Sequence, residues 1–409
     1  MNKFLITLLT IMAAAVLAVA QTKPGIETLR DNGFKQLQGK RVGLITNPTG
    51  VDRNLKSTID ILHEAPGVEL VALYGPEHGV RGDAHAGDKV DSNTDPATGV
   101  KVFSLYGATQ KPTKEMLKGV DVLVYDIQDI GCRSFTYIST MGKAMEACIE
   151  NDIEFMVLDR PNPLGGNKVE GCIVEDGFTS FVSQFPIPYV YGLTPGELAV
   201  MLNEEGIINP EKKVKLTVIP MSGWTRDMKY GDTGMPWVLP SPHIPQIESS
   251  YYYPVTGILG ELGFVSIGVG YTLPFQLVCA EWINAEDFCN ELNRLNLPGM
   301  AFRPIHIKPF YSVGQGKEFQ GVQIYVTDLE SANLSLTNFY IIQALAKLYP
   351  DHKTFECADK GRFNMFDKVC GTDKIRTKLS QNYQVSDISD YWNKDAESFK
   401  TRSAKYYLY

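Results

Sequence analysis

The sequence predicts an α/β fold, in which a Rossmann-like parallel sheet domain is followed by a smaller α+β C-terminal domain. Two observations predict the first domain: short runs of Val, Ile and Leu recur before residue 220, and helical patterns separate them. This alternation is typical of a parallel sheet that helices cover on both faces. A third observation, a proline-rich segment followed by mixed strand and helix patterns, predicts the second domain. A chain of 409 residues is long enough for both.

The first twenty residues are predicted to be a secretory signal peptide and not part of the fold. Lys3 precedes a largely apolar stretch from Phe4 to Ala20, which ends in the small-x-small cleavage pattern Ala18-Val19-Ala20. This apolar run is short for a membrane span, so an N-terminal membrane anchor is the less favoured alternative. We therefore expect cleavage before Gln21, export to the periplasm, and no stable membrane insertion afterwards.

The first domain is predicted to contain five strands with helices between them. The strands are Arg41–Thr46, Val68–Tyr74, Val120–Asp126, Ile153–Leu158 and Val214–Ile219. The helices are Asn54–Glu64, Lys114–Lys118, Tyr137–Glu150 and Thr194–Glu204. The last helix has a complete start signal, because Thr194 can serve as the N-cap, Pro195 fits the first helical position and Glu197 fits the third.

A proline-rich segment, Met235–Pro245, closes this half of the chain. Because proline donates no backbone hydrogen bond, so dense a run continues neither a helix nor a central strand. We place the boundary after residue 248, which gives a catalytic domain at 21–248 and a C-terminal domain at 249–409. The elements expected in the second domain are strands at Val265–Tyr271, His306–Pro309 and Gly321–Val326 and helices at Ala285–Leu295, Leu336–Leu348 and Asp387–Tyr409.

The composition excludes several classes of protein. Hydrophobic residues make up 44% and charged residues 21%, which is ordinary for a globular protein and excludes a disordered or multi-span membrane chain. The 39 basic and 47 acidic side chains give a net charge of −8, without a basic run, so we expect no nucleic-acid partner. The seven Cys have no metal-ligand spacing and are expected to be buried thiols, with room for one or two disulfides.

Polar clusters follow four of the predicted strands. Ligands of open parallel sheets bind at the carboxyl ends of the strands, so these clusters are expected to meet in one site. They are Thr46–Gly50, Gly75–Gly82, Tyr125–Arg133 and Asp159–Gly166, with Glu170 soon after. The sequence has no G-x-S-x-G, no Walker A motif, and no G-x-G-x-x-G after the first strand. The candidate chemistries that remain are acid/base catalysis by carboxylates and a metal site.

A metal site would use His78, Asp83, His85 and Asp88, which lie close together in a glycine-rich loop. The two His lack the spacing that places two ligands on one helical face, and the glycines predict a loop. We therefore favour a site without a metal and without another cofactor.

Glycoside hydrolysis fits the carboxylates best, since it needs a protonated acid near the leaving oxygen and usually a second carboxylate. Glu77 follows Pro76 at a strand end, where partial burial would raise its pKa. Asp126 and Glu170 are the candidate catalytic partners, and salt bridges with Arg133 or Arg160 are their alternative role. A structural role is favoured for Asp129 and Asp159. The candidate substrate-binding residues are Asn47, His78, Arg81, Gln128, Arg133, Tyr137, Arg160 and Asn162.

Several of these motifs resemble the exo-β-N-acetylmuramidase (NamZ-type) family. They are Gly43–Gly50, Gly75–Gly82, Asp126–Gly131 with Arg133, Asp159–Pro163 with Glu170-Gly171, Pro186–Pro188, Gly192–Leu198, and Phe366–Lys368 with Gly371-Thr372. The resemblance implies a site in the cleft between the two domains and release of N-acetylmuramic acid from the non-reducing end of peptidoglycan fragments. It also implies that neither a metal nor a nucleotide cofactor is needed, and that Glu77 is the catalytic acid.

The C-terminal half departs from the family pattern at three positions. Val269 stands where the family has Arg, Phe264 where it has Asn, and His243 where it has the Asn of Pro-Ser-Pro-Asn. The lost Arg matters because the lactyl carboxylate of muramic acid needs a cation. Arg81, Arg133 and Arg160 are the expected replacements. A diverged glycan-binding protein and a hydrolase of another amino-sugar glycan remain alternatives, as do retaining, inverting and N-acetyl-assisted mechanisms.

Overall fold

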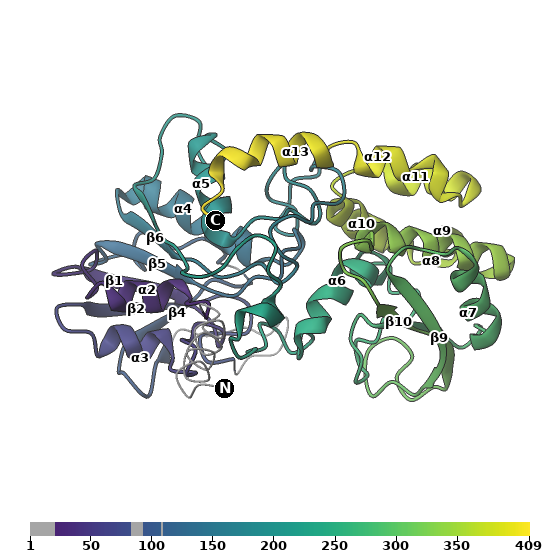
Figure 1. The fold of residues 1–409 in the computed structure, drawn as a ribbon, viewed down its shortest axis with the longest axis horizontal. Coiled ribbons are helices and arrows are strands. Elements are labelled where there is room, and N and C mark those ends of the chain that lie inside the picture. The colour runs from purple at the N-terminus through teal and green to yellow at the C-terminus, as the bar shows by residue number, and fades with distance from the viewer. Residues whose placement is uncertain (1–20, 83–92, 108) are drawn as a thin grey trace, which may run out of the picture.

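The computed structural model describes residues 21–82, 93–107 and 109–409, so the predicted signal peptide lies outside the described residues. A seven-stranded sheet forms the N-terminal domain, in the order β3-β4-β2-β1-β5-β6-β7 (Figure 1). Its neighbouring strands pair in parallel except β3 and β4, which are antiparallel. The strands are β1 (Arg41–Thr46), β2 (Glu69–Gly75), β3 (Asn93–Thr94), β4 (Lys101–Ser104), β5 (Val122–Asp126), β6 (Glu154–Leu158) and β7 (Leu216–Ile219).

Helices cover both faces of this sheet, as the alternating pattern predicted. They are α2 (Gly25–Asp31), α3 (Thr58–His63), α4 (Tyr137–Asn151) and α5 (Pro195–Glu204). In β1, Val42 and Leu44 pack in one core cluster with α2 and α3, whereas Ile45 packs in another with α4 and α5. Successive side chains of a strand point to opposite faces, so one strand contributes to both cores.

Local hydrogen bonds decide where the helices of this domain begin. The predicted Asn54–Glu64 helix starts only at Thr58, because the Asp52 carboxylate accepts bonds from the backbone N–H groups of Asn54 and Lys56 and holds them in a turn. The capping box predicted at the start of α5 is present: the side chains of Thr194 and Glu197 each accept a hydrogen bond from the other residue's backbone N–H. Residues 114–118 form turns, so the helix predicted there is wrong.

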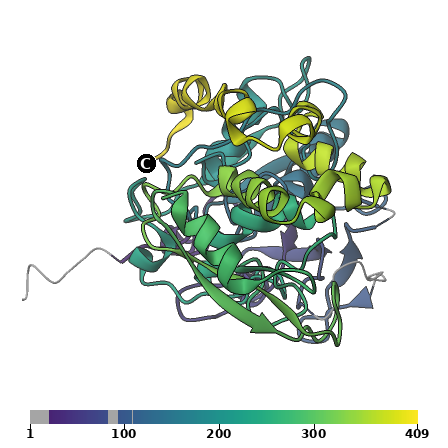
Figure 2. The same cartoon turned by 90° about the vertical axis from the view of Figure 1, so that its right-hand side faces the viewer.

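The C-terminal domain packs helices on a three-stranded antiparallel sheet in the order β8-β10-β9. Its main elements are α6 (Ile247–Gly260), β8 (Leu277–Ala280), α7 (Ala285–Arg294), β9 (Met300–Ile307), β10 (Phe319–Val326) and α8 (Leu334–Leu348). Shorter helices follow: α9 (Thr354–Cys357), α10 (Phe363–Cys370), α11 (Lys374–Asn382), α12 (Ser389–Asn393) and α13 (Ala396–Ser403). Figure 2 views this domain end-on, with its last helices in yellow-green at the top.

Two predictions for this domain are corrected by the structure. The segment Val265–Tyr271 is a loop and not a strand, because Gly268 and Gly270 adopt φ values of 89° and 93°, outside the range of a strand. The segment from Asp387 to the C-terminus is not one helix but is broken into α12, α13 and short 3-10 turns. Helix α6 was not predicted, since it follows the proline-rich segment directly and has Pro254 in its interior. The boundary predicted after residue 248 falls in its first turn.

The end of the chain returns to the N-terminal domain. Helix α13 lies beside α5 (Figure 1). Beyond it the Tyr409 hydroxyl donates to Asp159 over 2.7 Å and the Leu408 backbone N–H donates to Glu197 over 3.0 Å. One apolar core cluster also contains residues of both domains. The two domains are therefore joined firmly around the space between them.

The cysteines contribute thiols and not crosslinks. All seven are free, six of them are buried, and Cys357 is exposed, so the disulfides considered from the sequence are not formed.

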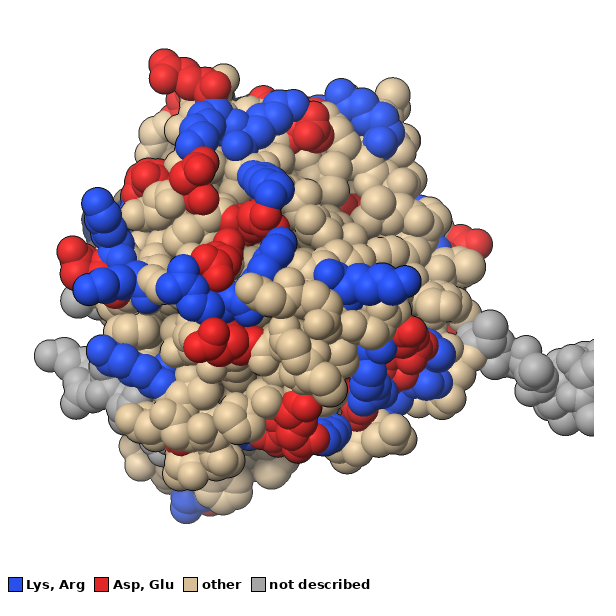
Figure 3. Space-filling model, turned by 90° about the vertical axis from the view of Figure 1, so that its left-hand side faces the viewer, with Lys and Arg blue, Asp and Glu red and all other residues tan. Residues whose placement is uncertain are grey.

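Within the described residues no helix is both long and apolar enough to cross a membrane. On the face of the N-terminal domain that Figure 3 shows, basic and acidic side chains are interspersed.

Candidate active site

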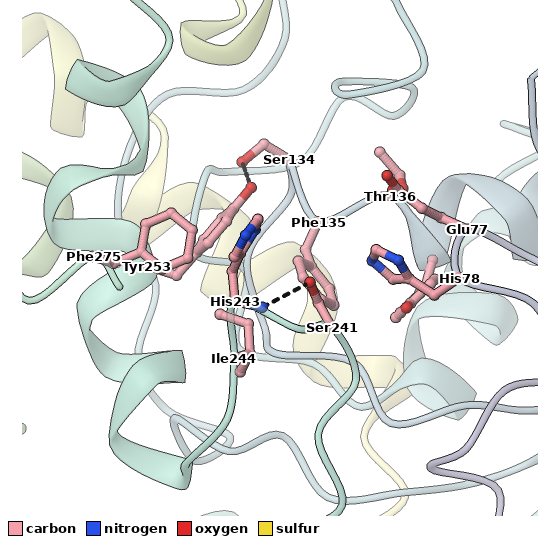
Figure 4. Close-up of a pocket in the computed structure, with 11 residues that line it drawn as sticks. Glu77, His78, Ser134, Phe135, Thr136, Ser241, His243, Ile244, Tyr253 and Phe275 are labelled. Atoms are coloured by element: carbon pink, nitrogen blue, oxygen red, sulfur yellow. Dashed lines mark hydrogen bonds between the residues drawn. The ribbon is translucent and has the colours of Figure 1, made fainter. Parts of the chain in front are cut away.

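A pocket of about 150 Å³ lies between the two domains (Figure 4). Its walls come from four places: the turn after β2, the segment entering α4, the proline-rich connector, and α6 with the loop before β8. The lining residues are Glu77, His78, Ser134, Phe135, Thr136, Tyr137, Ser241, His243, Ile244, Tyr253 and Phe275. Figure 4 shows Glu77 and His78 on one side and Tyr253 and Phe275 on the other.

A tight turn after β2 places Glu77 at the pocket. His78 has φ 74° and Gly79 has φ 75°, and the Gly79 N–H donates to the Pro76 carbonyl over 3.0 Å. A left-handed conformation is uncommon for a residue other than glycine and is found repeatedly at functional sites. Phe275, on the opposite wall, is also left-handed, with φ 64°. Glu77 is half-buried and His78 is buried.

Tyrosine hydroxyls and a neutral histidine surround Glu77. Burial, together with the interaction with Glu77, raises the pKa of Tyr106 to about 12. Burial also raises the pKa values of Tyr137 and Tyr253, and Glu77 adds to both. The pKa of His243 is lowered by burial and by nearby His78. These groups are uncharged at neutral pH, so they can orient sugar hydroxyls by hydrogen bonds next to a single carboxylate.

Asp126, the last residue of β5, forms a buried ion pair with Arg160, which follows β6. The Arg160 guanidinium donates to both Asp126 oxygens, and its Nη2 also donates to the Val51 carbonyl over 2.9 Å. The Thr58 hydroxyl donates to the second Asp126 oxygen over 2.5 Å. Neither Asp126 nor Arg160 lines the pocket. The salt bridge considered as the alternative role of Asp126 is thus what the structure contains.

Glu170 holds the C-terminal domain in place and does not line the pocket. Its two carboxylate oxygens accept the backbone N–H groups of Leu334 and Ser335, at 3.1 and 2.7 Å, at the start of α8. The first N–H groups of a helix have no partner within it, and a carboxylate there also interacts favourably with the helix dipole. Lys168 contributes a further ion pair at 3.2 Å. Glu170 therefore acts as a helix cap between domains.

Two of the arginines predicted to bind substrate are engaged elsewhere. Arg81 donates to both oxygens of Asp95, at 2.9 and 3.0 Å, and to Asp60 at 3.3 Å. Arg133 is fully buried and donates to four backbone carbonyl oxygens. With Arg160 paired to Asp126, all three arginines expected to meet the substrate carboxylate have other partners.

The remaining predicted residues, Asn47, Gln128 and Asn162, are buried and do not line the pocket. Gln128 donates to the carbonyls of Asp129 and Pro161, and Asn162 donates to the Leu193 carbonyl. Asn47 accepts from the backbone and hydroxyl of Thr49. Three buried side-chain atoms in these loops have no hydrogen-bond partner among the described residues: Asn47 Nδ2, Gln128 Oε1 and Asp129 Oδ1. Their contacts shape the loops that carry the pocket residues.

Family models match nearly the whole chain beyond residue 41. The N-terminal part of exo-β-N-acetylmuramidase NamZ matches residues 42–248, and the C-terminal part matches residues 251–409.

The chain belongs to the NamZ family. The resemblance inferred from the sequence motifs is thereby confirmed, and with it the assignment to a family of glycoside hydrolases.

Individual relatives agree with the family models. The peptidoglycan β-N-acetylmuramidase NamZ of Bacillus subtilis (strain 168) is 48% identical over 389 residues, which cover 95% of this chain and 92% of that protein. A solved DUF1343 family protein from Bacteroides fragilis NCTC 9343 is 61% identical with a TM-score of 0.91, covering 95% of this chain and 99% of that one. A second from the same organism is 29% identical over the same shares, with a TM-score of 0.75. The predicted fold class is confirmed.

Sequence reasoning missed several residues of the NamZ-family pocket. Tyr253 lies on the unpredicted helix α6, and Phe275 lies before the unpredicted β8. Tyr106, which interacts with Glu77 without lining the pocket, follows the unpredicted strand β4. The Tyr251–Tyr253 run beside the proline-rich segment was a usable signal, since three consecutive aromatic residues near a predicted cleft are unusual. Among the predicted residues, Glu77, His78 and Tyr137 line the pocket.

Asp129 and Asp159, for which a structural role was favoured, both accept hydrogen bonds that hold neighbouring loops. Asp129 accepts from the Gly131 N–H over 2.7 Å and from the Tyr191 hydroxyl. Asp159 accepts from the hydroxyls of Thr194 and Tyr409, each over 2.7 Å. Burial raises the pKa of each carboxyl to about 7. Both fix the loops at the carboxyl edge of the sheet.

Proposed function

We propose that the protein is an exported exo-β-N-acetylmuramidase, which releases N-acetylmuramic acid from the non-reducing ends of peptidoglycan fragments. The observation that carries the proposal is the position of Glu77. Among the described residues that line the pocket between the domains, it is the one carboxylate. It lies there in a chain that matches the NamZ family over both domains. Export is inferred from the apolar N-terminal segment.

Glu77 acts as the general acid in this proposal. When the bond between the anomeric carbon and the glycosidic oxygen breaks, water supplies the new oxygen on the anomeric carbon, directly or after an intermediate, and the leaving oxygen gains negative charge. A proton transferred from the Glu77 carboxyl neutralises that charge. The uncharged His243 ring and the tyrosine hydroxyls can hydrogen-bond sugar hydroxyls without competing for the proton. The rings of Phe135 and Phe275 offer apolar surface to the C–H groups of a pyranose.

The first test compares two chromogenic substrates, the β-glycosides of N-acetylmuramic acid and of N-acetylglucosamine with the same aryl group. We expect the mature protein to release the aryl group from the muramic substrate at least about tenfold faster, because an ionic contact to the lactyl carboxylate is worth about 1.5–3 kcal/mol. Equal rates would point to a hydrolase of another amino-sugar glycan. Binding of both sugars without release of either aryl group would favour a non-catalytic glycan-binding protein.

A second test concerns metal dependence. The described residues contain no group of three or more His, Cys, Asp or Glu able to hold a metal ion. Of the ligands considered from the sequence, Asp83, His85 and Asp88 lie outside the described residues, whereas His78 lines the pocket. Because a carboxyl acid needs no metal, we expect unchanged kcat and KM after dialysis against EDTA. Loss of activity that added zinc or manganese restores would contradict this and support the metal-dependent alternative.

A further inference from the structure

Among the described residues, the pocket that contains Glu77 has no Lys or Arg side chain for the substrate's carboxylate. N-acetylmuramic acid differs from N-acetylglucosamine by a lactyl ether on the ring, which ends in a carboxylate or, in peptidoglycan, in a peptide stem. The described lining residues include no Lys or Arg. Arg81, Arg133 and Arg160 are held by Asp95, by backbone carbonyls and by Asp126. A cation supplied by the described residues therefore has to come from outside this first pocket.

A second chamber of about 350 Å³ adjoins the first pocket. The two share Tyr253 and Phe275 as a common wall. The carboxylates of Glu77 and Glu261, one from each side, both raise the pKa of Tyr253, after burial itself. The rest of the chamber combines small, polar and apolar residues with two charged ones: Gly257, Gly260, Glu261, Gly263, Val265, Ser266, Ile267, Val269, Ser312, Val313 and Arg362. Because the two pockets share these residues, a substituent on a sugar bound beside Glu77 would have to pass Tyr253 and Phe275 to reach the chamber.

Arg362 supplies the guanidinium of this chamber. Its Nε donates to the Glu261 carbonyl over 2.6 Å, and it packs against Gly263, where an added Cβ would lie 3.1 Å from the same nitrogen. The side chain is exposed, and among the described residues it forms no ion pair with a carboxylate. Its terminal nitrogens are thus available to a ligand oxygen.

The chamber also contains the carboxyl group of Glu261. Glu261 is largely removed from water, and burial raises the pKa of its carboxyl, although Arg362 opposes the shift. Burial therefore disfavours the charged form of this carboxyl, and a protonated carboxyl carries no charge and can donate a hydrogen bond to an anion. Ser266 and Ser312 add neutral hydroxyls at the wall.

We propose that this chamber receives the carboxyl-bearing arm of N-acetylmuramic acid and that Arg362 binds its carboxylate. The inference rests on the proposed muramidase function and adds to it the site that distinguishes muramic acid from glucosamine. Arginine suits this role because its planar guanidinium forms two parallel hydrogen bonds to one carboxylate. The carboxylate can belong to the lactyl group itself or to a peptide stem attached to it.

The test uses three aryl β-glycosides: that of N-acetylmuramic acid, its lactyl carboxamide, and its lactyl-L-alanine conjugate, in which the carboxylate has moved to the alanine. We expect the wild-type protein to prefer the acid over the carboxamide about ten- to hundredfold in kcat/KM. In Arg362→Gln the ratio should fall to about one, mainly through KM. Arg303→Gln, which removes an exposed arginine of β9 outside the chamber, should leave the ratio unchanged. A loss confined to the alanine conjugate would identify the stem as the source.

Two outcomes separate this inference from the function on which it rests. If Arg362→Gln keeps the wild-type preference for the acid while turnover is normal, the Arg362 assignment is wrong and the muramidase function stands. If no muramic glycoside is cleaved, the proposed function fails. Calorimetric binding of free N-acetylmuramic acid and its carboxamide to wild-type protein and Arg362→Gln then still decides the assignment, since equal affinities of both proteins for the acid would overturn it.

Discussion

We expect Glu77→Gln to lower kcat on N-acetylmuramyl disaccharide substrates by about 10²–10⁴-fold, the usual contribution of a positioned general acid. The amide has the shape of the carboxyl but cannot release a proton to the glycosidic oxygen. Glu77 forms no salt bridge among the described residues, and it interacts with the phenol of Tyr106. The substitution should therefore leave the fold and the thermal unfolding temperature almost unchanged.

Substrates with different leaving groups distinguish a catalytic acid from a carboxylate with a structural role. A poor leaving group such as N-acetylglucosamine needs the proton, whereas a dinitrophenolate departs without it. If Glu77 is the acid, the defect of Glu77→Gln shrinks as the leaving group improves. A defect of equal size on both substrates would remove Glu77 from proton transfer. Glu397→Gln is the matched control, because Glu397 is a highly exposed carboxylate on α13 and pairs with Lys400 at the surface.

The parts of the fold that burial determines could be predicted from the sequence. The strand predicted at Arg41–Thr46 coincides with β1, and four others lie within two residues of the observed strands. These strands are buried between helices, so their Val, Ile and Leu runs are continuous. Strands β3 and β4 lie at the edge of the sheet. Strand β3 consists of two polar residues and β4 spans Lys101–Ser104, so neither contains a continuous run of Val, Ile and Leu. The pattern there is too weak to indicate a strand.

The site could be predicted only where one segment carries both the turn and the functional side chain. The turn Gly75–Gly79 has this property, so Glu77 and His78 were found. The opposite wall comes from Tyr253 and Phe275, which lie far along the chain on elements that the sequence did not indicate. Motif reasoning also selected too many residues. Buried backbone N–H groups need hydrogen-bond partners, and Glu170 accepts from two of them at the start of α8. In the sequence, such a structural carboxylate cannot be told from a catalytic one.

Arg133 is the residue for which the sequence-based and structural interpretations differ most. The motif predicted substrate binding, whereas the structure buries the guanidinium completely between the domains. Its two Nη atoms donate to the carbonyls of Cys172 and Ile187, at 2.8 and 2.5 Å, and of Val369 and Cys370, both at 2.9 Å. The last two carbonyls end α10, where a cation also interacts favourably with the helix dipole.

We expect Arg133→Met to destabilise the protein by about 3–5 kcal/mol, because several buried carbonyls lose their donor and each costs about 1–3 kcal/mol unless water or relaxation restores a partner. Urea unfolding measures the loss. Arg41→Met is the matched control, since Arg41 forms a half-exposed pair with Asp121, and such pairs contribute about 0–1 kcal/mol. If Arg133 instead bound substrate, the variant would unfold like the wild-type protein and raise KM. Stability and KM therefore assign Arg133 to one role or the other, and the four carbonyl contacts predict that stability is what changes.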